Sequence, residues 1–408
     1  MFASTPRPAN MLKESKKRKK VFVMMSGGVD SSVAAYLLKK QKKYDVIGAF
    51  IKGYNVDGCQ EKDAEDARRA AEYLKIPFYV IDLEEDYKKL VVDYMVDGYK
   101  RGITPNPDVM CNKEIKFGLF FKKALELGGD YVATGHYVRK RDSKLRIHSN
   151  LRTQFKIAKA FKSAKDIFVD SDKFVVSHRL YQAKDLSKDQ SYFLWTLTQE
   201  QLKHCLFPIG GYLKSEVREI ARKAGLSTAE RKESQGICFL GMVSLKDFLK
   251  QYLPVKNGDV LLVLNNGEEK IVYKKIGTHD GVWFYTVGQR HGLGIAGKKP
   301  YYIAEKDIKK NILIVTEGKE NPLLYKNEIN LTQVNFINPQ SIINNKQQRV
   351  YARVRYRQAL AKAKLICRLS LVVGCKLIFE EPVKFVAPGQ SAVFYNKRGE
   401  LLGGGIIV

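Results

Sequence analysis

Residues 21–32 read VFVMMSGGVDSS, and this stretch decides the fold of the N-terminal half of the chain. The apolar run Val21–Met25 is typical of a buried strand, and the residues after the glycines predict a helix. A glycine-rich turn between a strand and a helix collects backbone N–H groups at the helix N-terminus, where they bind phosphate. The lysine of a Walker loop is missing, so the stretch predicts a phosphate loop of another kind. A plain strand-to-helix turn is the alternative.

The same alternation of strand and helix continues along the next hundred residues. Short β-branched runs predict strands at 21–25, 46–51, 78–83 and 131–134, and helical stretches are predicted at 31–40, 61–75, 84–100 and 112–127. This order is typical of a doubly wound α/β domain with a parallel sheet. The α/β character returns in SKDQSYFLWTL and SEVREIARKAGL and ends near Ser227.

Changes in composition divide the chain into four parts. Residues 1–20 form a basic arm that we expect to be disordered. The α/β domain spans 21–227 and contains a basic insertion at 139–178 without clear periodicity, which is typical of a solvated loop or of added phosphate contacts. Beyond it, short strands separated by Gly, Asn-Gly and Pro predict a small β-rich central domain at 228–299 and a C-terminal β-barrel at 300–408.

The charge of the chain indicates a polyanionic partner. Lys and Arg number 71 against 43 Asp and Glu, a formal net charge of +28, and RNA, DNA or an anionic membrane are the candidates. No apolar run reaches the roughly 18 residues of a spanning helix, and the N-terminus lacks the apolar core of a secretory signal. We therefore expect a cytoplasmic protein that does not enter a membrane.

The cysteines exclude several kinds of site and single out one thiol. None of the six forms a C-x-x-C pair, which argues against a zinc ribbon, an iron–sulfur site of usual spacing and a thioredoxin-type couple. Cys111, in TPNPDVMCNKEIKFG, precedes a helix predicted to begin near Asn112. A helix N-terminus and the nearby Lys113 would lower the pKa of this thiol and make it a nucleophile. A small buried apolar side chain is the alternative, for Cys111 and for Cys238 in ESQGICFLG.

A second basic motif lies in the C-terminal region. The stretch RVYARVRYRQ alternates strictly and predicts one strand face with Tyr351, Arg353, Arg355 and Arg357. Arginine interleaved with tyrosine contacts phosphates and stacks on bases, so this face predicts nucleic acid binding. A solvated edge strand whose charges prevent aggregation is the alternative.

At SGGVDSS the chain resembles the PP-loop ATP pyrophosphatases, which bind ATP and transfer AMP to an oxygen with release of pyrophosphate. The resemblance implies that the loop binds the ATP phosphates and that Asp30 contributes to Mg²⁺ binding. The loop then consists of Ser26, Gly27, Gly28, Val29, Asp30 and Ser31.

Nearly the whole chain is similar to the tRNA-specific 2-thiouridylase family, because nine motifs occur in the family's order. They are SGGVDSS, NPDVMCNKEIKFG, ATGHYVR, KDQSYFL, GICFLG, YTVGQRHGLG, VRYRQ, APGQSAVFY and LGGGII. The resemblance implies that Cys111 is the nucleophile and that Cys238 carries a persulfide sulfur supplied by a sulfur relay protein or a cysteine desulfurase. The sulfur would replace the 2-oxygen of a wobble uridine, activated by AMP and flipped into the site. Either the Cys238 persulfide attacks directly, or Cys111 frees sulfide from it.

The same resemblance assigns further residues. Asp108 is an acid or base, with a helix-capping carboxylate as the alternative. The target base contacts Asn106, Pro107 and Asp108. The adenine side of the ATP pocket includes Met24, Met25, Ile51 and Gly135, where strand-end core residues are the alternative. The tRNA contacts are His136, Lys188, Asp189, Gln190, Arg355, Tyr356 and Gln390.

Two departures from the family and two rival functions complete the prediction. Met24 stands where the family usually has Gly, which would narrow the loop entrance or turn a side chain outward, and the segment 139–178 is longer than typical. Cys59, Cys205, Cys367 and Cys375 match no functional position and are read as ordinary thiols. A PP-loop enzyme that adenylates a small molecule has no need of paired cysteines or a basic barrel. A non-catalytic RNA-binding protein has no need of the intact loop.

Overall fold

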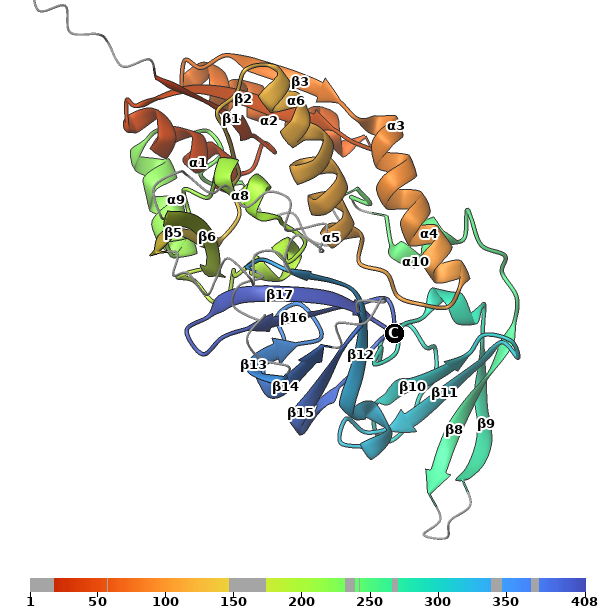
Figure 1. The fold of residues 1–408 in the computed structure, drawn as a ribbon. Coiled ribbons are helices and arrows are strands. Elements are labelled where there is room, and N and C mark those ends of the chain that lie inside the picture. Colours follow the sequence, from red (N-terminus) through yellow and green to blue (C-terminus); the bar gives the residue numbers. More distant parts are fainter. Residues whose placement is uncertain are drawn as a thin grey trace, which may run out of the picture.

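The fold is that of a computed structural model, which describes residues 18–56, 58–146, 174–231, 239–241, 243–265, 271–338, 347–367 and 374–408. Figure 1 shows a layered α/β part, a β-barrel below it and a smaller β-sheet beside the barrel. The basic arm predicted at 1–20 lies outside the described residues except for Arg18, Lys19 and Lys20, of which the last two begin the first strand.

The α/β part contains a five-stranded sheet in the order β3-β2-β1-β4-β7, with every pair parallel. Its strands are β1 (Lys19–Met24), β2 (Tyr44–Lys52), β3 (Phe78–Asp82), β4 (Tyr131–Ala133) and β7 (Cys205–Leu206). The helices are α1 (Val29–Lys40), α2 (Cys59–Tyr73), α3 (Glu84–Tyr87), the π-helix η1 (Lys88–Val92), α4 (Asp93–Lys100), α5 (Pro107–Met110), the π-helix η2 (Cys111–Phe120), α6 (Phe121–Glu126), the 3-10 helix η4 (Ser191–Leu194), α8 (Gln199–His204) and α9 (Lys214–Lys223).

Helices cover both faces of this sheet, which confirms the doubly wound prediction. Alternate side chains of a strand point to opposite faces. Val21 and Val23 accordingly pack in one apolar cluster with α1, α2 and α9, and Phe22 and Met24 pack in another with η2 and α6. The second cluster explains the departure at Met24, whose side chain is buried under Phe120 and neither narrows the loop nor turns outward.

The central unit consists of α10 (Leu245–Leu249), η5 (Val282–Phe284) and a four-stranded sheet in the order β10-β11-β8-β9. Its strands are β8 (Gly258–Asn265), β9 (Ile271–His279), β10 (Tyr301–Asp307) and β11 (Ile312–Glu317). Because β11 pairs with β8, the sheet continues to Glu317. The boundary predicted between residues 299 and 300 falls inside this unit and is wrong.

The C-terminal strands close a six-stranded barrel, since β12 pairs with both β15 and β17. The barrel follows η6 (Pro322–Leu324) and consists of β12 (Tyr325–Phe336), β13 (Gln347–Arg353), β14 (Ala361–Cys367), β15 (Cys375–Lys384), β16 (Ser391–Tyr395) and β17 (Glu400–Ile407). The strand predicted to continue through RVYARVRYRQ ends at Arg353, so Arg355 and Arg357 lie in the loop after it. The predicted common face of these arginines is therefore wrong.

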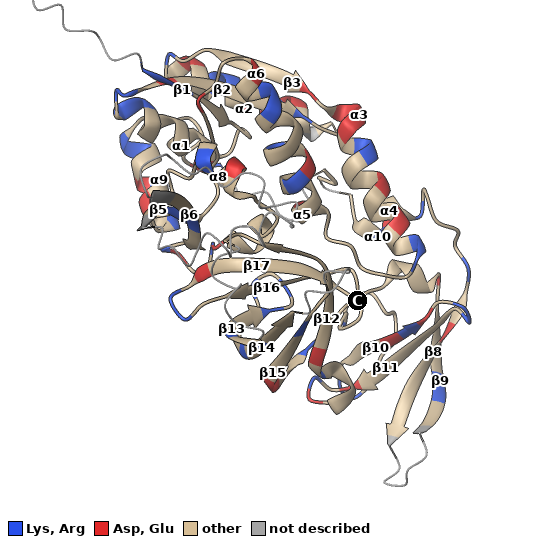
Figure 2. Ribbon diagram, viewed as in Figure 1, with Lys and Arg blue, Asp and Glu red and all other residues tan. Residues whose placement is uncertain are grey.

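The predicted basic insertion supplies two strands to this sheet. β5 (Val138–Arg146) and β6 (Phe174–Gln182) form an antiparallel hairpin, and β6 pairs with β17. The ends of the insertion are thus strands and not a solvated loop, while 147–173 lie outside the described residues. Figure 2 shows basic residues spread along the ribbon and an acidic stretch at α3, where Glu84, Glu85 and Asp86 are adjacent. Within the described ranges, no helix is long and apolar enough to cross a membrane.

Candidate active site

The glycine-rich turn between β1 and α1 has the conformation of an anion-binding loop. Gly27 has a φ of +73°, which glycine adopts without strain, and Gly28 caps α1 without a side-chain hydrogen bond. The Ser31 hydroxyl accepts from the Ser26 N–H at 3.1 Å and donates to the Gly28 carbonyl at 3.1 Å. The loop is therefore fixed by its own residues, with the N-terminus of α1 directed toward it.

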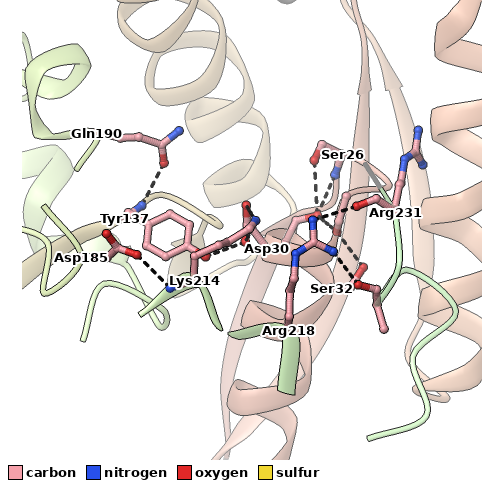
Figure 3. Close-up of polar contacts among 12 residues, drawn as sticks. Ser26, Asp30, Ser32, Tyr137, Asp185, Gln190, Lys214, Arg218 and Arg231 are labelled. Atoms are coloured by element: carbon pink, nitrogen blue, oxygen red, sulfur yellow. Dashed lines mark hydrogen bonds and ion pairs between the residues drawn. The ribbon is translucent and has the colours of Figure 1, made fainter. Parts of the chain in front are cut away.

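Asp30 is held by two residues that sequence reasoning did not assign to the site. The Lys214 Nζ lies 2.7 and 2.8 Å from the two carboxylate oxygens of Asp30, and the Tyr137 hydroxyl donates to one of them at 2.8 Å. Figure 3 shows Lys214 and Tyr137 converging on Asp30 from one side of the loop. The carboxylate that was predicted to contribute to Mg²⁺ binding is thus engaged by a cation of the protein.

Arginines support the other side of the loop (Figure 3). Arg231 donates to the Gly27 carbonyl at 2.9 Å and forms ion pairs with Asp63 and Asp66 of α2. Arg218 of α9 donates to the Arg231 carbonyl at 3.1 Å. These contacts fix the end of the described chain before residues 232–238 directly against the phosphate loop.

The turn after β4 packs against the same loop. A Cβ at Gly135 would lie 2.7 Å from the Ser31 nitrogen, so only glycine fits there without displacement. The neighbouring His136 is 8% exposed, and its Nδ1 lies 2.7 Å from the Thr134 hydroxyl. Burial, and then the charge of Lys116, lower the pKa of His136 well below its ordinary value, so the imidazole is neutral at pH 7.

The predicted adenine-side residues other than Gly135 lie in the core. Met24 and Met25 point to opposite faces of the sheet and are buried in different clusters, and Ile51 is partly buried. Their side chains do not converge on one pocket, and the core alternative describes them better. A contact between a nucleotide and this strand end would involve backbone atoms.

Cys111 lies in one helical stretch formed by α5, η2 and α6, which packs against all three parts of the molecule. Its own cluster joins the α/β part to the central unit, and two further clusters contact the barrel and the parallel sheet. Cys111 is 4% exposed, and burial raises the pKa of its thiol. The prediction of a lowered pKa is therefore wrong, because burial outweighs the charge of Lys116 and the hydrogen bond with Tyr87. The predicted cation is also wrong, since Lys113 points outward and pairs with Glu114 at 2.7 Å.

The N-terminus of this helical stretch is capped by Asn106. Its side-chain oxygen accepts from the Val109 N–H at 3.1 Å, with Pro107 in the first turn, where proline is favoured. The capping role considered for Asp108 therefore belongs to Asn106. The half-buried Asp108 carboxylate has an electrostatic influence on the Cys111 thiol.

Cys238 lies outside the described residues, but both flanks are placed. Arg231 contacts the phosphate loop, and Phe239 packs in the cluster of Cys111, where its ring centroid lies 5.8 Å from that of Tyr87. Arg231 and Phe239, which flank this segment in the sequence, thus lie at the two predicted halves of the site.

A cavity of about 320 Å³ opens beside Asn106, between α5, the segment 195–198 and the barrel. Val109, Met110 and Trp195 supply apolar walls, and Asn335 of β12 supplies a polar group. Its volume is within the range of small-molecule sites. Within the described ranges, no cluster of three or more His, Cys, Asp or Glu side chains forms a metal site.

Asp189, predicted to contact tRNA, lies in the interface between the α/β part and the barrel. It is 2% exposed, pairs with the buried Arg353, and accepts from the Ser191 hydroxyl at 2.9 Å. The carboxylate is therefore engaged inside the protein, and a tRNA contact at Asp189 stays a prediction. Arg353, predicted on the RNA-binding face, is buried for the same reason. The flanking Lys188 and Gln190 are half-buried.

The other predicted tRNA residues gather where the barrel meets its neighbours. Arg355 donates to the Phe385 carbonyl at 2.9 Å and to the Val287 carbonyl of the central unit. Gln390 donates to the Thr104 and Pro105 carbonyls at 3.0 and 3.2 Å. The Tyr356 ring centroid lies 4.4 Å from that of Phe193. The barrel thus supports the loop that leads to Asn106.

The remaining cysteines are not all free thiols. Cys367 and Cys375 face each other across β14 and β15 and form a disulfide, because their positions are directly opposite in the antiparallel ladder. Their prediction as ordinary thiols is wrong. Cys205 is a free buried thiol whose pKa burial raises to about 12. The side chain of Cys59 lies outside the described residues.

One sequence signal for Lys214 was available. A lysine in the first turn of a helix is unfavourable with the helix dipole, and Lys214 begins α9 while Glu216 accepts from the Leu213 N–H at 2.6 Å. A lysine in the first turn of a helix therefore indicates that an acidic side chain from another element pairs with it. Which partner it is follows only from the fold.

Comparisons with known proteins cover the whole architecture. Residues 19–242 match the family described as tRNA methyl transferase HUP domain, residues 246–317 the tRNA methyl transferase PRC-barrel domain, and residues 326–407 the aminomethyltransferase beta-barrel domain. The second match ends with β11, in agreement with the sheet boundary in the structure.

Curated relatives match over nearly their whole length. The tRNA-specific 2-thiouridylase MnmA of Bacillus licheniformis is 44% identical over 95% of this chain and 94% of its own. That of Bacillus subtilis is 43% identical over the same shares, and that of Chlamydia abortus is 41% identical over 95% of this chain and 97% of its own.

Proposed function

The chain belongs to the tRNA-specific 2-thiouridylase family, and from this premise we propose that it uses ATP to replace the 2-oxygen of a wobble uridine in tRNA by sulfur. The products are 2-thiouridine, AMP and pyrophosphate. One observation carries the proposal for this chain. The residues flanking the Cys238 segment contact the phosphate loop on one side, through Arg231, and the cluster of Cys111 on the other, through Phe239.

The nucleotide half of the site is proposed at residues Ser26–Ser31. The positive φ of Gly27, the open cap at Gly28 and the N-terminus of α1 support binding of the ATP phosphates. Gly135 forms the adjoining wall, since it packs on Ser31. Lys214 is a further cation at this position, and it currently pairs with Asp30.

Mg²⁺ is proposed to enter with ATP. The fit of Asp30 as its ligand is poor in this arrangement, because Lys214 and Tyr137 engage the carboxylate. No residue of this chain is therefore assigned as a Mg²⁺ ligand.

The sulfur half is proposed at Cys111 and Cys238. Transfer of AMP to the uracil 2-oxygen makes that oxygen a good leaving group, and a sulfur nucleophile then attacks the ring carbon. In both routes the Cys111 thiolate attacks Sγ of Cys238, and the outer sulfur leaves with the electron pair. The resulting Cys111–Cys238 disulfide needs a thiol reductant before the next turnover. A persulfide-delivering relay protein or cysteine desulfurase is the proposed sulfur source.

The target base is proposed to bind at Asn106, Pro107 and Asp108. A base stacked in a helix is out of reach of these residues, so the target base must be flipped out. The cavity beside Asn106 supports binding of the flipped base at this place. Asp108 lies in the first turn of the same helical stretch as Cys111, where its carboxylate is proposed to exchange a proton with the base or the sulfur.

The tRNA itself is proposed to lie across the junction of the three units. The residues at or near this junction are Lys188, Gln190, Arg355, Tyr356 and Gln390. Gln390 couples the barrel to the Asn106 loop, and Arg355 couples it to the central unit. His136 and Asp189 are buried, and we propose that they position their neighbours.

The test is a reaction with ATP, Mg²⁺, a persulfide donor and unmodified tRNA, followed by mass spectrometry of the nucleosides. We expect the wild type to form 2-thiouridine and an equivalent amount of AMP. We expect Cys238→Ser and Cys111→Ser to form no 2-thiouridine but to bind tRNA as the wild type does. Cys205→Ala, which changes a buried thiol outside the site, is the control. Normal 2-thiouridine formation by Cys238→Ser, or AMP transfer to a small molecule only, would contradict the proposal.

A further inference from the structure

The peptide group between Gly27 and Gly28 decides whether the phosphate loop presents a donor or an acceptor to a ligand. Its carbonyl belongs to Gly27 and its N–H to Gly28, and like every peptide bond among the described residues it is trans. In a trans peptide group the C=O and the N–H point in opposite directions. Whichever of the two faces a bound phosphate, the other therefore faces the protein.

Arg231 fixes this orientation from the protein side (Figure 3). Its Nη1 donates to the Gly27 carbonyl at 2.9 Å. Gly27 is buried, so its carbonyl depends on a donor from the protein. Gly28 is half-buried, and its N–H donates to no acceptor within the described part of the chain. The acceptor of this peptide group is thus satisfied inside the protein, and its donor is left for a ligand.

Glycines on both sides make this peptide group easy to turn over. Gly27 has a φ of +73° and Gly28 a φ of −83°, and glycine adopts either sign about equally readily. A half-turn of the peptide group would direct the Gly27 carbonyl oxygen toward the phosphate oxygens, which repel it because all of them carry negative charge. The loop therefore needs a contact from outside the motif to keep one orientation.

Two carboxylates and a second arginine hold Arg231 in place. Its guanidinium forms ion pairs with Asp63 and Asp66 of α2. Arg218 of α9 donates to the Ala229 carbonyl at 2.7 Å and to the Arg231 carbonyl at 3.1 Å. Two carboxylates beside one guanidinium leave no excess positive charge at this place, so the cluster itself does not attract a phosphate.

We propose that Arg231 is the positioning residue that holds the Gly27–Gly28 peptide group with its N–H toward the ATP phosphates. The inference rests on the proposed function, which assigns these phosphates to the loop. Arg231 acts through the peptide group and touches no reacting atom.

The test measures binding of ATP and of adenosine to the full-length protein by calorimetry. In Arg231→Met we expect ATP to bind about tenfold more weakly than in the wild type, because one hydrogen bond to a charged group is lost. Adenosine has no phosphate, so its affinity should not change. Arg231→Lys keeps a donor for the Gly27 carbonyl and should recover most of the ATP affinity. The matched control Arg222→Met removes an exposed pair with Glu230 and should change neither affinity.

A combined variant separates the orientation of the peptide group from the charge of the cluster. Arg231→Met leaves the Asp63 and Asp66 carboxylates without this cation, and their charge alone would repel ATP. When Asp63→Ala and Asp66→Ala are added to Arg231→Met, that charge is removed, and we expect ATP binding to stay weak. Amide hydrogen exchange of the peptide that contains Gly27 and Gly28 should be faster than in the wild type in both variants.

Four outcomes would overturn the inference. They are wild-type ATP affinity in Arg231→Met, equal losses of ATP and adenosine affinity in that variant, an equal loss in Arg222→Met, and full recovery in the combined variant. If Arg231→Met does not fold, Arg231→Leu takes its place, judged by the same comparison of ATP with adenosine. Failure of the proposed function is a different result, namely a wild type that binds ATP but forms no 2-thiouridine.

Discussion

The phosphate loop and the Cys111 helix both use a helix N-terminus, yet they are built over different distances in the sequence. The loop is held by hydrogen bonds among Ser26, Gly28 and Ser31, which are at most five residues apart. The Cys111 helix is enclosed by three apolar clusters whose members extend from Phe22 to Leu401. A local motif therefore specifies the turn of the first region, to which Arg231 and Lys214 add long-range contacts, whereas only the assembled fold specifies the second region.

The difference has a direct electrostatic consequence. At the loop, no side chain caps the N-terminus of α1, so the prediction from the motif is consistent with the geometry found. At Cys111, remote side chains remove the water that would stabilise a thiolate, so the expected sign of the pKa shift is reversed. Variants that break the long-range contacts can therefore be compared directly with variants that change the loop.

The largest effect is expected where the long-range contacts are broken. Arg353→Met leaves the buried Asp189 carboxylate without its cation, and loss of one partner of a buried pair costs roughly 3–5 kcal/mol. The free energy of unfolding from urea titration measures it. Lys376→Met removes an exposed pair with Glu328 and should cost less than about 1 kcal/mol. Equal losses in the two variants would mean that the Asp189 contact does not hold the units together.

The next largest effect is expected from a substitution that displaces the phosphate loop. The added Cβ of Gly135→Ala would lie 2.7 Å from the Ser31 nitrogen and 2.8 Å from the Asp30 carbonyl carbon, so the loop must shift. We expect pyrophosphate release to slow roughly a hundredfold, because a small displacement of reacting groups has that effect on a rate. ATP affinity, measured by calorimetry, should fall as well. Gly211→Ala, where the added atom meets open space, should leave affinity unchanged. Wild-type affinity in Gly135→Ala would place the nucleotide elsewhere.

Lys214→Met tests the contact that joins the loop to a distant helix. Without the ammonium group, the Asp30 carboxylate keeps the hydrogen bond from Tyr137 and repels the incoming phosphates. We expect pyrophosphate release to slow about tenfold at fixed ATP. Lys184→Met, which removes the exposed pair with Glu216, is the control. Additional replacement of Asp30 by Asn should recover part of the loss, and no recovery would show that repulsion is not the cause.

The smallest effect is expected at the hydroxyl that contacts the Cys111 thiol. Tyr87 favours the thiolate by hydrogen bonding, so Tyr87→Phe should raise the pKa of Cys111 further and lower the thiolate fraction at every pH below it. Alkylation at pH 8 should slow about two- to threefold, the effect of one modest hydrogen bond. Tyr79→Phe changes an exposed tyrosine and serves as the control. A faster reaction in Tyr87→Phe would mean that the tyrosine shields the thiol and does not stabilise its charge.

The sequence by itself determined the strand and helix alternation, the conformation of the loop at Gly27 and Gly28, and membership of the family through its ordered motifs. These features depend on side-chain periodicity and on backbone preferences of adjacent residues, which are legible in a short window. The cap at Asn106 belongs to the same class, because a cap and its partner are three residues apart.

Tertiary structure alone decided which charges meet. Arg353 was expected to face RNA and instead pairs with Asp189, 164 positions away, and Lys214 reaches Asp30 across 184 positions. Strand partners that no local pattern identifies decide three further features. These are the boundary at Glu317, the hairpin that extends the barrel, and the pairing of Cys367 with Cys375. The pKa of an ionisable side chain depends on the groups that surround it and on how much water remains around it. Both are set only when distant segments pack together.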